Sequence, residues 1–137
     1  MRAFLDTSSL FKKYVEEHGS NTLDRLLQEI SEIAVSPVTW IEINAVVAKR
    51  LRDKSLTSQQ AAWLMAEARK DFQSFHRVIW TDALEQTAID CASQYALSTL
   101  DAIQLAAGVL SKAQLFVTSD RGLFEEAQKA LRKVMYI

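Results

Sequence analysis

Short apolar runs alternate along this chain with longer segments in which apolar residues recur at helical spacing. The runs 2–5, 33–36 and 115–118 show no regular alternation of polar and apolar residues. Strands that are apolar on both faces are typical of a parallel sheet covered by helices on both sides. The sequence therefore predicts an α/β fold with three α/β/α layers and a short, mostly parallel central sheet.

The predicted elements fill most of the chain. Strands are expected at 2–5, 33–36, 78–80, 115–118 and 134–137. Helices are expected at about 7–17, 21–31, 38–52, 58–74, 83–96, 99–111 and 121–131. Gly19 marks the end of the first helix, and Thr57 or Ser58 is the expected N-cap of the fourth. Without an internal repeat or linker, residues 1–137 form a single expected domain.

The composition excludes several classes of protein. A net charge of −1 argues against a basic surface that coats nucleic acid in bulk. The single cysteine, Cys91, excludes an internal disulfide and suits a reducing compartment. No stretch approaches the roughly 20 apolar residues of a membrane span, and the N-terminus reaches Asp6 too soon for a signal peptide. We therefore expect a cytoplasmic protein without a membrane partner.

Four acidic residues stand at the edges of apolar segments. Asp6 and Asp120 directly follow apolar runs, while Glu42 and Asp101 lie near the starts of predicted helices. In parallel α/β folds, ligands bind beyond the carboxyl ends of the strands, so Asp6 and Asp120 are expected at such a place. Carboxylates gathered at one point do not all stay ionised without cations. This pattern favours divalent-metal chemistry.

Each of these acids also has a simpler interpretation. Asp6 and Asp120 stand where helix N-caps are expected, and Asp101 completes a capping box that begins at Ser98. Glu42 is harder to explain, because its neighbours three and four residues away are mostly apolar. A charge in that stripe needs a cation, a hydrogen-bond donor or a metal. A salt bridge is therefore an alternative to a functional role.

No other catalytic pattern is evident. The chain has no His/Cys cluster with zinc spacing, no Gly-rich nucleotide-binding loop and no Ser–His nucleophile motif. If the chain binds nucleic acid, it does so at a confined site. Candidate phosphate contacts, which surface solvation explains equally well, are Lys12, Lys13, Lys49, Arg50 and Arg121.

Four motifs extend over essentially the whole chain: Phe4-Leu5-Asp6-Thr7-Ser8, Trp40-Ile41-Glu42-Ile43, Leu100-Asp101-Ala102-Ile103-Gln104-Leu105-Ala106 and Phe116-Val117-Thr118-Ser119-Asp120. In order and spacing they resemble the motifs of the PIN-domain ribonucleases, in particular the VapC toxins of bacterial and archaeal toxin–antitoxin pairs. Leu100 departs from the pattern, since relatives often carry Tyr or another polar residue there. This departure concerns substrate contacts more than metal binding.

The resemblance implies a metal-dependent endoribonuclease that uses Mg²⁺ or Mn²⁺ and acts on single-stranded regions of RNA. It implies that all four acids are catalytic and metal-binding, with Asp6 and Asp101 as the principal ligands and Glu42 and Asp120 completing the site. Supporting polar groups would be Ser8 and Thr118. The resemblance also implies a homodimer and a small VapB-like antitoxin that places a basic side chain among the acids.

Two other functions are open on the residues alone. A non-catalytic module of the same fold would use its acidic pocket only to capture a basic partner. An aspartyl-phosphate enzyme would use Asp6 as the acceptor, but a phosphatase of that type needs a second Asp where Ser8 stands. The paired acids and late Lys of a receiver domain are also not evident. The ordered motifs therefore favour the ribonuclease.

Overall fold

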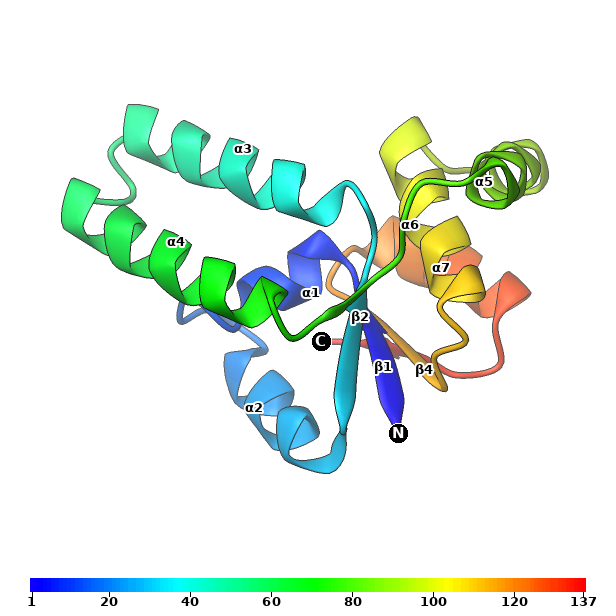
Figure 1. Cartoon of the computed structure of the whole chain (residues 1–137), viewed down its shortest axis with the longest axis horizontal. Coiled ribbons are helices and arrows are strands. Elements are labelled where there is room, and N and C mark those ends of the chain that lie inside the picture. Colours follow the sequence, from blue (N-terminus) through cyan, green and yellow to red (C-terminus); the bar gives the residue numbers. More distant parts are fainter.

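A five-stranded parallel sheet in the order β3-β2-β1-β4-β5 forms the centre of the computed structural model, which describes all residues 1–137 (Figure 1). The strands are β1 (Arg2–Leu5), β2 (Glu32–Val35), β3 (His76–Arg77), β4 (Leu115–Thr118) and β5 (Val134–Tyr136). The helices are α1 (Thr7–Phe11), α2 (Ser20–Glu29), α3 (Thr39–Arg52), α4 (Ser58–Phe72), α5 (Asp82–Gln94), α6 (Thr99–Leu110) and α7 (Arg121–Ala130).

Successive residues of the central strands point into two separate hydrophobic cores. Ala3 and Leu5 lie in a core with residues of α1 to α4, whereas Phe4 lies in a core with residues of α5 to α7. Figure 1 shows these two groups of helices on either side of the sheet. Both faces are buried, which explains why the strands lack alternation. The predicted three-layer α/β/α fold is confirmed, and every strand pairing is parallel.

The strand order places a topological switch point between β1 and β4. The chain runs from β1 outward through β2 to β3, and then returns to the other side of β1 to form β4 and β5. In open α/β sheets the crevice for a ligand lies at such a point, beyond the carboxyl ends of the strands. Leu5 pairs with Val117 in this register, so the residues that follow β1 and β4 begin side by side.

The first predicted helix, 7–17, is wrong in its length. Helix α1 ends at Phe11, and the chain continues in turns towards α2. The buried Ser20 hydroxyl binds the carbonyl oxygens of Lys12 and Val15 at 3.0 and 3.2 Å, which draws these groups away from a continued helix. Gly19 does not end α1 but is the N-cap of α2, with a left-handed φ of 94° that favours glycine.

The predicted strand 78–80 is also misplaced. Strand β3 is His76–Arg77, and its last ladder contact is from the Val78 amide to the Val35 carbonyl at 3.0 Å. Strand β2 ends at Val35, so the residues after Val78 have no neighbour with which to pair. The apolar character of Ile79 therefore does not reflect burial, and its side chain is 71% exposed.

The remaining predicted elements agree with the structure to within about two residues. The expected cap of α4 is Thr57, which forms a reciprocal capping box with Gln60. No helix combines the length and apolar character that crossing a membrane would require.

Gly108 in α6 provides a test of the packing beneath the sheet. A Cβ there would lie 2.5 Å from the Phe116 ring, which is buried and stacked on Phe4 at a centroid distance of 5.1 Å. We expect Gly108→Ala to lower the free energy of unfolding by about 1–3 kcal/mol despite alanine's higher helix propensity, as measured by urea denaturation. Gly122→Ala is the control, because its Cβ meets only the Asp120 Oδ1 atom at 3.4 Å. Equal stability of the two variants would contradict this packing account.

Candidate active site

Asp6 lies directly after β1 and is buried, with 4% of its surface exposed. Its Oδ1 atom accepts hydrogen bonds from the Ser9 amide at 2.9 Å and the Ser9 hydroxyl at 2.8 Å. Its Oδ2 atom accepts a hydrogen bond from the Thr118 hydroxyl at 2.6 Å. Burial raises the pKa of this carboxyl group, and the bonds from Thr118, Ser9 and Ser8 oppose that rise.

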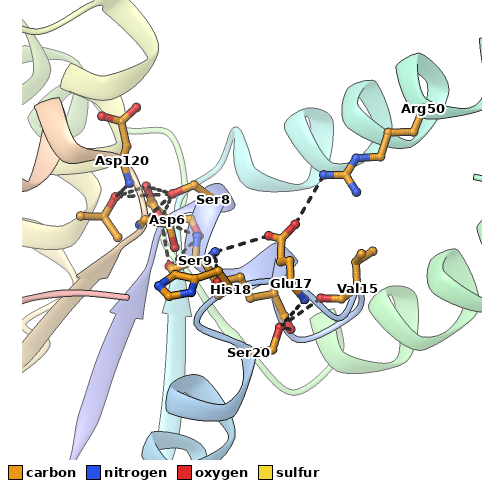
Figure 2. Close-up of polar contacts among 12 residues, drawn as sticks. Asp6, Ser8, Ser9, Val15, Glu17, His18, Ser20, Arg50 and Asp120 are labelled. Carbon is orange, nitrogen blue, oxygen red and sulfur yellow. Dashed lines mark hydrogen bonds and ion pairs between the residues drawn. The ribbon is translucent and has the colours of Figure 1, made fainter. Parts of the chain in front are cut away.

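Two hydroxyl groups connect Asp6 to the end of β4. The Ser8 hydroxyl donates to Asp6, 2.9 and 2.8 Å from its two oxygens, and accepts the Ser119 amide at 3.0 Å. The Thr118 hydroxyl donates to Asp6 and accepts the Asp120 amide at 3.0 Å. Figure 2 shows this arrangement around Asp6. Ser8 and Thr118 thus contact Asp6 directly, in the position that a supporting role requires.

Asp120 is an exposed residue at the start of α7. Its side chain caps that helix by accepting the Leu123 amide at 2.9 Å. Asp6 caps α1 in the same way through the Ser9 amide. The cap interpretations of both residues are therefore correct, and they coexist with a shared location at the switch point.

Glu42 in the first turn of α3 is held by two hydrogen-bond donors. Its Oε1 atom accepts from the Thr7 hydroxyl at 2.9 Å and from the Gln104 side-chain amide at 2.6 Å. No ion pair involves Glu42, so hydrogen bonds and not a salt bridge offset its partial burial. Because Thr7 follows Asp6, this contact places Glu42 beside the Asp6 site.

Asp101 in the first turn of α6 interacts with the other acids through space. Desolvation by burial is the largest cause that raises the pKa of its carboxyl group, and the negative charges of Asp120 and Glu42 raise it further. The Ser98 hydroxyl lowers this pKa and also accepts the Asp101 amide at 3.3 Å, which is the predicted helix cap. The charges of Asp120 and Glu42 thus both act on Asp101, which places each of them near it.

The chemistry of the donor set suits a hard divalent cation, although no three acidic, His or Cys side chains converge on a single metal-binding point. Mg²⁺ is usually held by one or two carboxylates and keeps several waters, so it does not need three converging protein ligands. A cation would also relieve the repulsion that raises the pKa of Asp101. The residues present therefore fit Mg²⁺ or Mn²⁺.

Sequence reasoning missed three residues of this site. Thr7 and Ser9 looked like ordinary residues of a helix start, yet they donate to Glu42 and Asp6. Gln104 is 3% exposed within the apolar helix α6, and its Oε1 atom has no hydrogen-bond partner. An uncharged polar residue inside an otherwise apolar helix, three positions after Asp101, was the signal that could have identified it.

Comparison with families of known proteins gives a match over most of the chain. A family model described as PIN domain matches residues 3–130. This match confirms the resemblance predicted from the four motifs. A search of the curated proteins found no match.

Solved structures with the same fold include several complexes. FitAcB from Neisseria gonorrhoeae has a TM-score of 0.75 at 15% identity, with 97% of this chain and 96% of that chain covered. VapBC2 from Rickettsia felis, bound to a promoter DNA fragment, has a TM-score of 0.70 at 12% identity, with 100% and 99% covered. A toxin–antitoxin complex from Klebsiella pneumoniae has a TM-score of 0.65 at 20% identity, with 89% of each chain covered. At these identities the likeness establishes the fold.

The raised pKa of Asp101, caused first by burial and then by the charges of Asp120 and Glu42, predicts a pH-dependent gain in stability on its neutralisation. Its pKa in the folded protein lies above the ordinary 3.8, so the wild type loses stability as pH rises from the unfolded-state pKa through the folded-state pKa. Asp101→Asn should therefore melt higher than the metal-free wild type near pH 7, by up to about 3 °C. By about pH 3 the difference in melting temperature should vanish, because Asp101 of the wild type is then protonated and neutral, as Asn is.

Thermal melts in chelator across this pH range measure the effect. Asp24→Asn, which neutralises an exposed acid on α2, serves as the control and should show no such pH-dependent gain. A melting temperature of Asp101→Asn equal to or below that of the wild type near pH 7 would contradict a raised pKa of Asp101 in the folded protein.

Proposed function

This chain belongs to the PIN domain family, and on that premise we propose that it is a metal-dependent endoribonuclease that hydrolyses phosphodiester bonds in single-stranded regions of RNA. The observation that carries the proposal is that acids from four segments lie near the β1–β4 switch point, without converging on a single metal-binding point. Asp6 follows β1, Asp120 follows β4, and Glu42 and Asp101 come from the first turns of α3 and α6. The pKa of Asp101, raised first by burial and then by the charges of Asp120 and Glu42, supports a site that takes up a cation.

In this proposal, Asp6 and Asp101 are the principal ligands of Mg²⁺ or Mn²⁺, and Glu42 and Asp120 complete the site. When bound, the metal supplies Lewis-acid activation of water and of the phosphodiester. Hard cations of this kind prefer carboxylate and water oxygens, which is the donor set at this edge of the sheet.

The protein's own part in the reaction is orientation. Ser8 and Thr118 fix the plane of the Asp6 carboxylate through hydrogen bonds of 2.6 to 2.9 Å. Thr7 and Gln104 fix the Glu42 carboxylate in the same way. Groups held like this need no reorganisation when charge develops on the phosphate oxygens. Glu42 and Asp120 then orient water towards the phosphorus, on the side opposite the leaving oxygen.

We further propose that the nuclease is the toxin of a VapBC-type pair. A toxin–antitoxin complex and VapBC2 are among the structures with this fold, which supports the proposal at the level of the fold. A small antitoxin would inhibit the nuclease by placing a basic side chain among the acids, where it would take the place of the cation. A homodimer and a cytoplasmic location belong to the same proposal.

Cleavage of a single-stranded RNA should require Mg²⁺ or Mn²⁺ and should stop in excess chelator. Asp6→Asn and Asp101→Asn should each lower the cleavage rate by about 10²- to 10⁴-fold, since each removes a charged ligand. Rates come from gel or fluorescence assays, and circular dichroism checks that the variants fold. Asp24→Asn, which lies on the exposed face of α2, should cleave like the wild type.

Full activity in both site variants, or in chelator, would refute the nuclease proposal. The competing idea, a non-catalytic module that captures a basic partner, predicts no cleavage and no rise of melting temperature in millimolar Mn²⁺. The nuclease proposal predicts both cleavage and a rise in melting temperature, because a ligand that binds only the folded state raises the melting temperature.

The toxin proposal predicts that induced expression of the chain arrests bacterial growth. Asp101→Asn should relieve the arrest while the protein accumulates to the wild-type level on immunoblots. Arrest by Asp101→Asn as strong as that by the wild type would separate toxicity from the acidic site.

A further inference from the structure

A cavity of about 410 Å³ opens beside the acidic site, and its lining carries both signs of charge. Ser8 and Glu42 contribute to it from the acidic site, and Lys12 and Arg50 contribute cations. The volume lies within the range of about 300–1,000 Å³ that is typical of small-molecule sites. It therefore has room for a nucleotide unit next to the acids.

The structure distinguishes among the five basic residues proposed from sequence as phosphate contacts. Lys13 forms an ion pair with Asp71 at 2.6 Å, and the Arg121 guanidinium stacks over the Tyr136 ring at 4.2 Å. Lys49 is exposed on α3 and does not line the cavity. Only Lys12 and Arg50 line the cavity beside the acidic site.

Each cation also has an uncharged partner that holds it in place. The Arg50 guanidinium carbon lies 4.6 Å from the centroid of the Phe11 ring, which is a cation–π contact. The Lys12 side chain is 10% exposed, and its Nζ atom donates to the His18 carbonyl at 2.5 Å. Since these two partners are a ring face and a neutral carbonyl, they do not neutralise either positive charge.

Glu17 is the one anion that approaches both cations. Its carboxylate oxygens lie 3.5 Å from Lys12 Nζ and 3.7 Å from Arg50 Nη2, and Figure 2 shows its side chain reaching towards Arg50. Neither contact is recorded as a hydrogen bond, and the carboxylate is 31% exposed, so both pairs are loose and weak. The Ser20 hydroxyl anchors the backbone of this loop by accepting the Glu17 amide at 3.0 Å.

We propose that Lys12 and Arg50 form a subsite for a backbone phosphate of the RNA strand, one that neighbours the bond cleaved at the acids, and that Glu17 occupies this subsite in the free protein. A backbone phosphate offers two charged oxygens to the planar fork of arginine, as a carboxylate does. Because Glu17 stays 3.5 and 3.7 Å from the two cations and forms no hydrogen bond to either, a phosphate that binds in close contact displaces it. The subsite rests on the proposed function, because it places the strand beside the acidic site.

Two variants on α3 test the arginine. We expect Arg50→Met to weaken binding of a labelled single-stranded RNA by about tenfold. The salt dependence of log K should also become shallower by about 0.7, the value for one phosphate contact on a single strand. Lys49→Met removes the same charge one residue away and should change affinity by less than about twofold. Fluorescence anisotropy of the full chain in chelator measures binding without cleavage.

Glu17→Gln tests whether RNA displaces the Glu17 carboxylate, and its effect on RNA affinity should be opposite to that of Arg50→Met. Removing the competing anion should tighten RNA binding by about threefold, whereas a purely structural Glu17 would leave affinity unchanged or lower it. In cleavage assays, Arg50→Met should raise KM while kcat changes by less than about twofold.

Equal effects of Arg50→Met and Lys49→Met, or no tightening in Glu17→Gln, would overturn the subsite. The binding assay separates this outcome from failure of the nuclease. RNA that binds with these differences but is not cleaved leaves the subsite standing and refutes the proposed function. RNA that is cleaved but shows no such differences in affinity supports the nuclease and overturns the subsite. RNA that is neither bound nor cleaved overturns the nuclease and the subsite together.

Discussion

The hydrogen bonds that satisfy the buried Asp6 carboxylate tie the site to the fold. An unpaired carboxylate in the interior costs several kcal/mol, so Asp6 is tolerated only where donors converge on it. Those donors come from the start of α1 and from Thr118 at the end of β4. The Thr118 hydrogen bond requires strands β1 and β4 to lie side by side in the observed register. The same register creates the switch point, where Asp120 directly follows β4.

How well the sequence predicted each element depended on whether local or distant contacts determine it. The strands 2–5 and 115–118 match the structure because residues buried on both faces produce an apolar run that is visible locally. The end of α1 was not predictable in this way, since it is set by Ser20, which lies eight residues beyond Lys12. The position of β3 likewise depends on where its partner β2 stops. Hydrogen bonds between separate segments leave little trace in apolar periodicity.

From the sequence, the acids could be interpreted either as helix caps or as members of a functional cluster. The structure shows that these two interpretations are compatible. Asp6 and Asp120 cap α1 and α7 and still lie at the switch point, because the helices that follow parallel strands begin at the carboxyl edge of the sheet. The positive end of a helix dipole stabilises an acid there. The cap and the functional role therefore have the same physical origin. The partners Thr7 and Gln104 escaped prediction because their contacts join α1, α3 and α6.

The hydrogen bonds that Asp6 already accepts also change the roles in metal binding that are expected of the acids. A carboxylate has about four lone-pair positions, and four donors face Asp6: the Ser9 amide and the hydroxyl groups of Ser8, Ser9 and Thr118. Asp6 therefore has a position for a cation only when the Ser9 hydroxyl donates instead to the Val117 carbonyl, which lies 2.9 Å away. Asp101 and Asp120 are less buried and must adjust around it. An acidic site of this kind repels a polyanion before any metal binds, and the chain's net charge of −1 gives no general attraction. Attraction for a phosphate backbone must therefore come from cations fixed close to the acids, and Lys12 and Arg50 have that position.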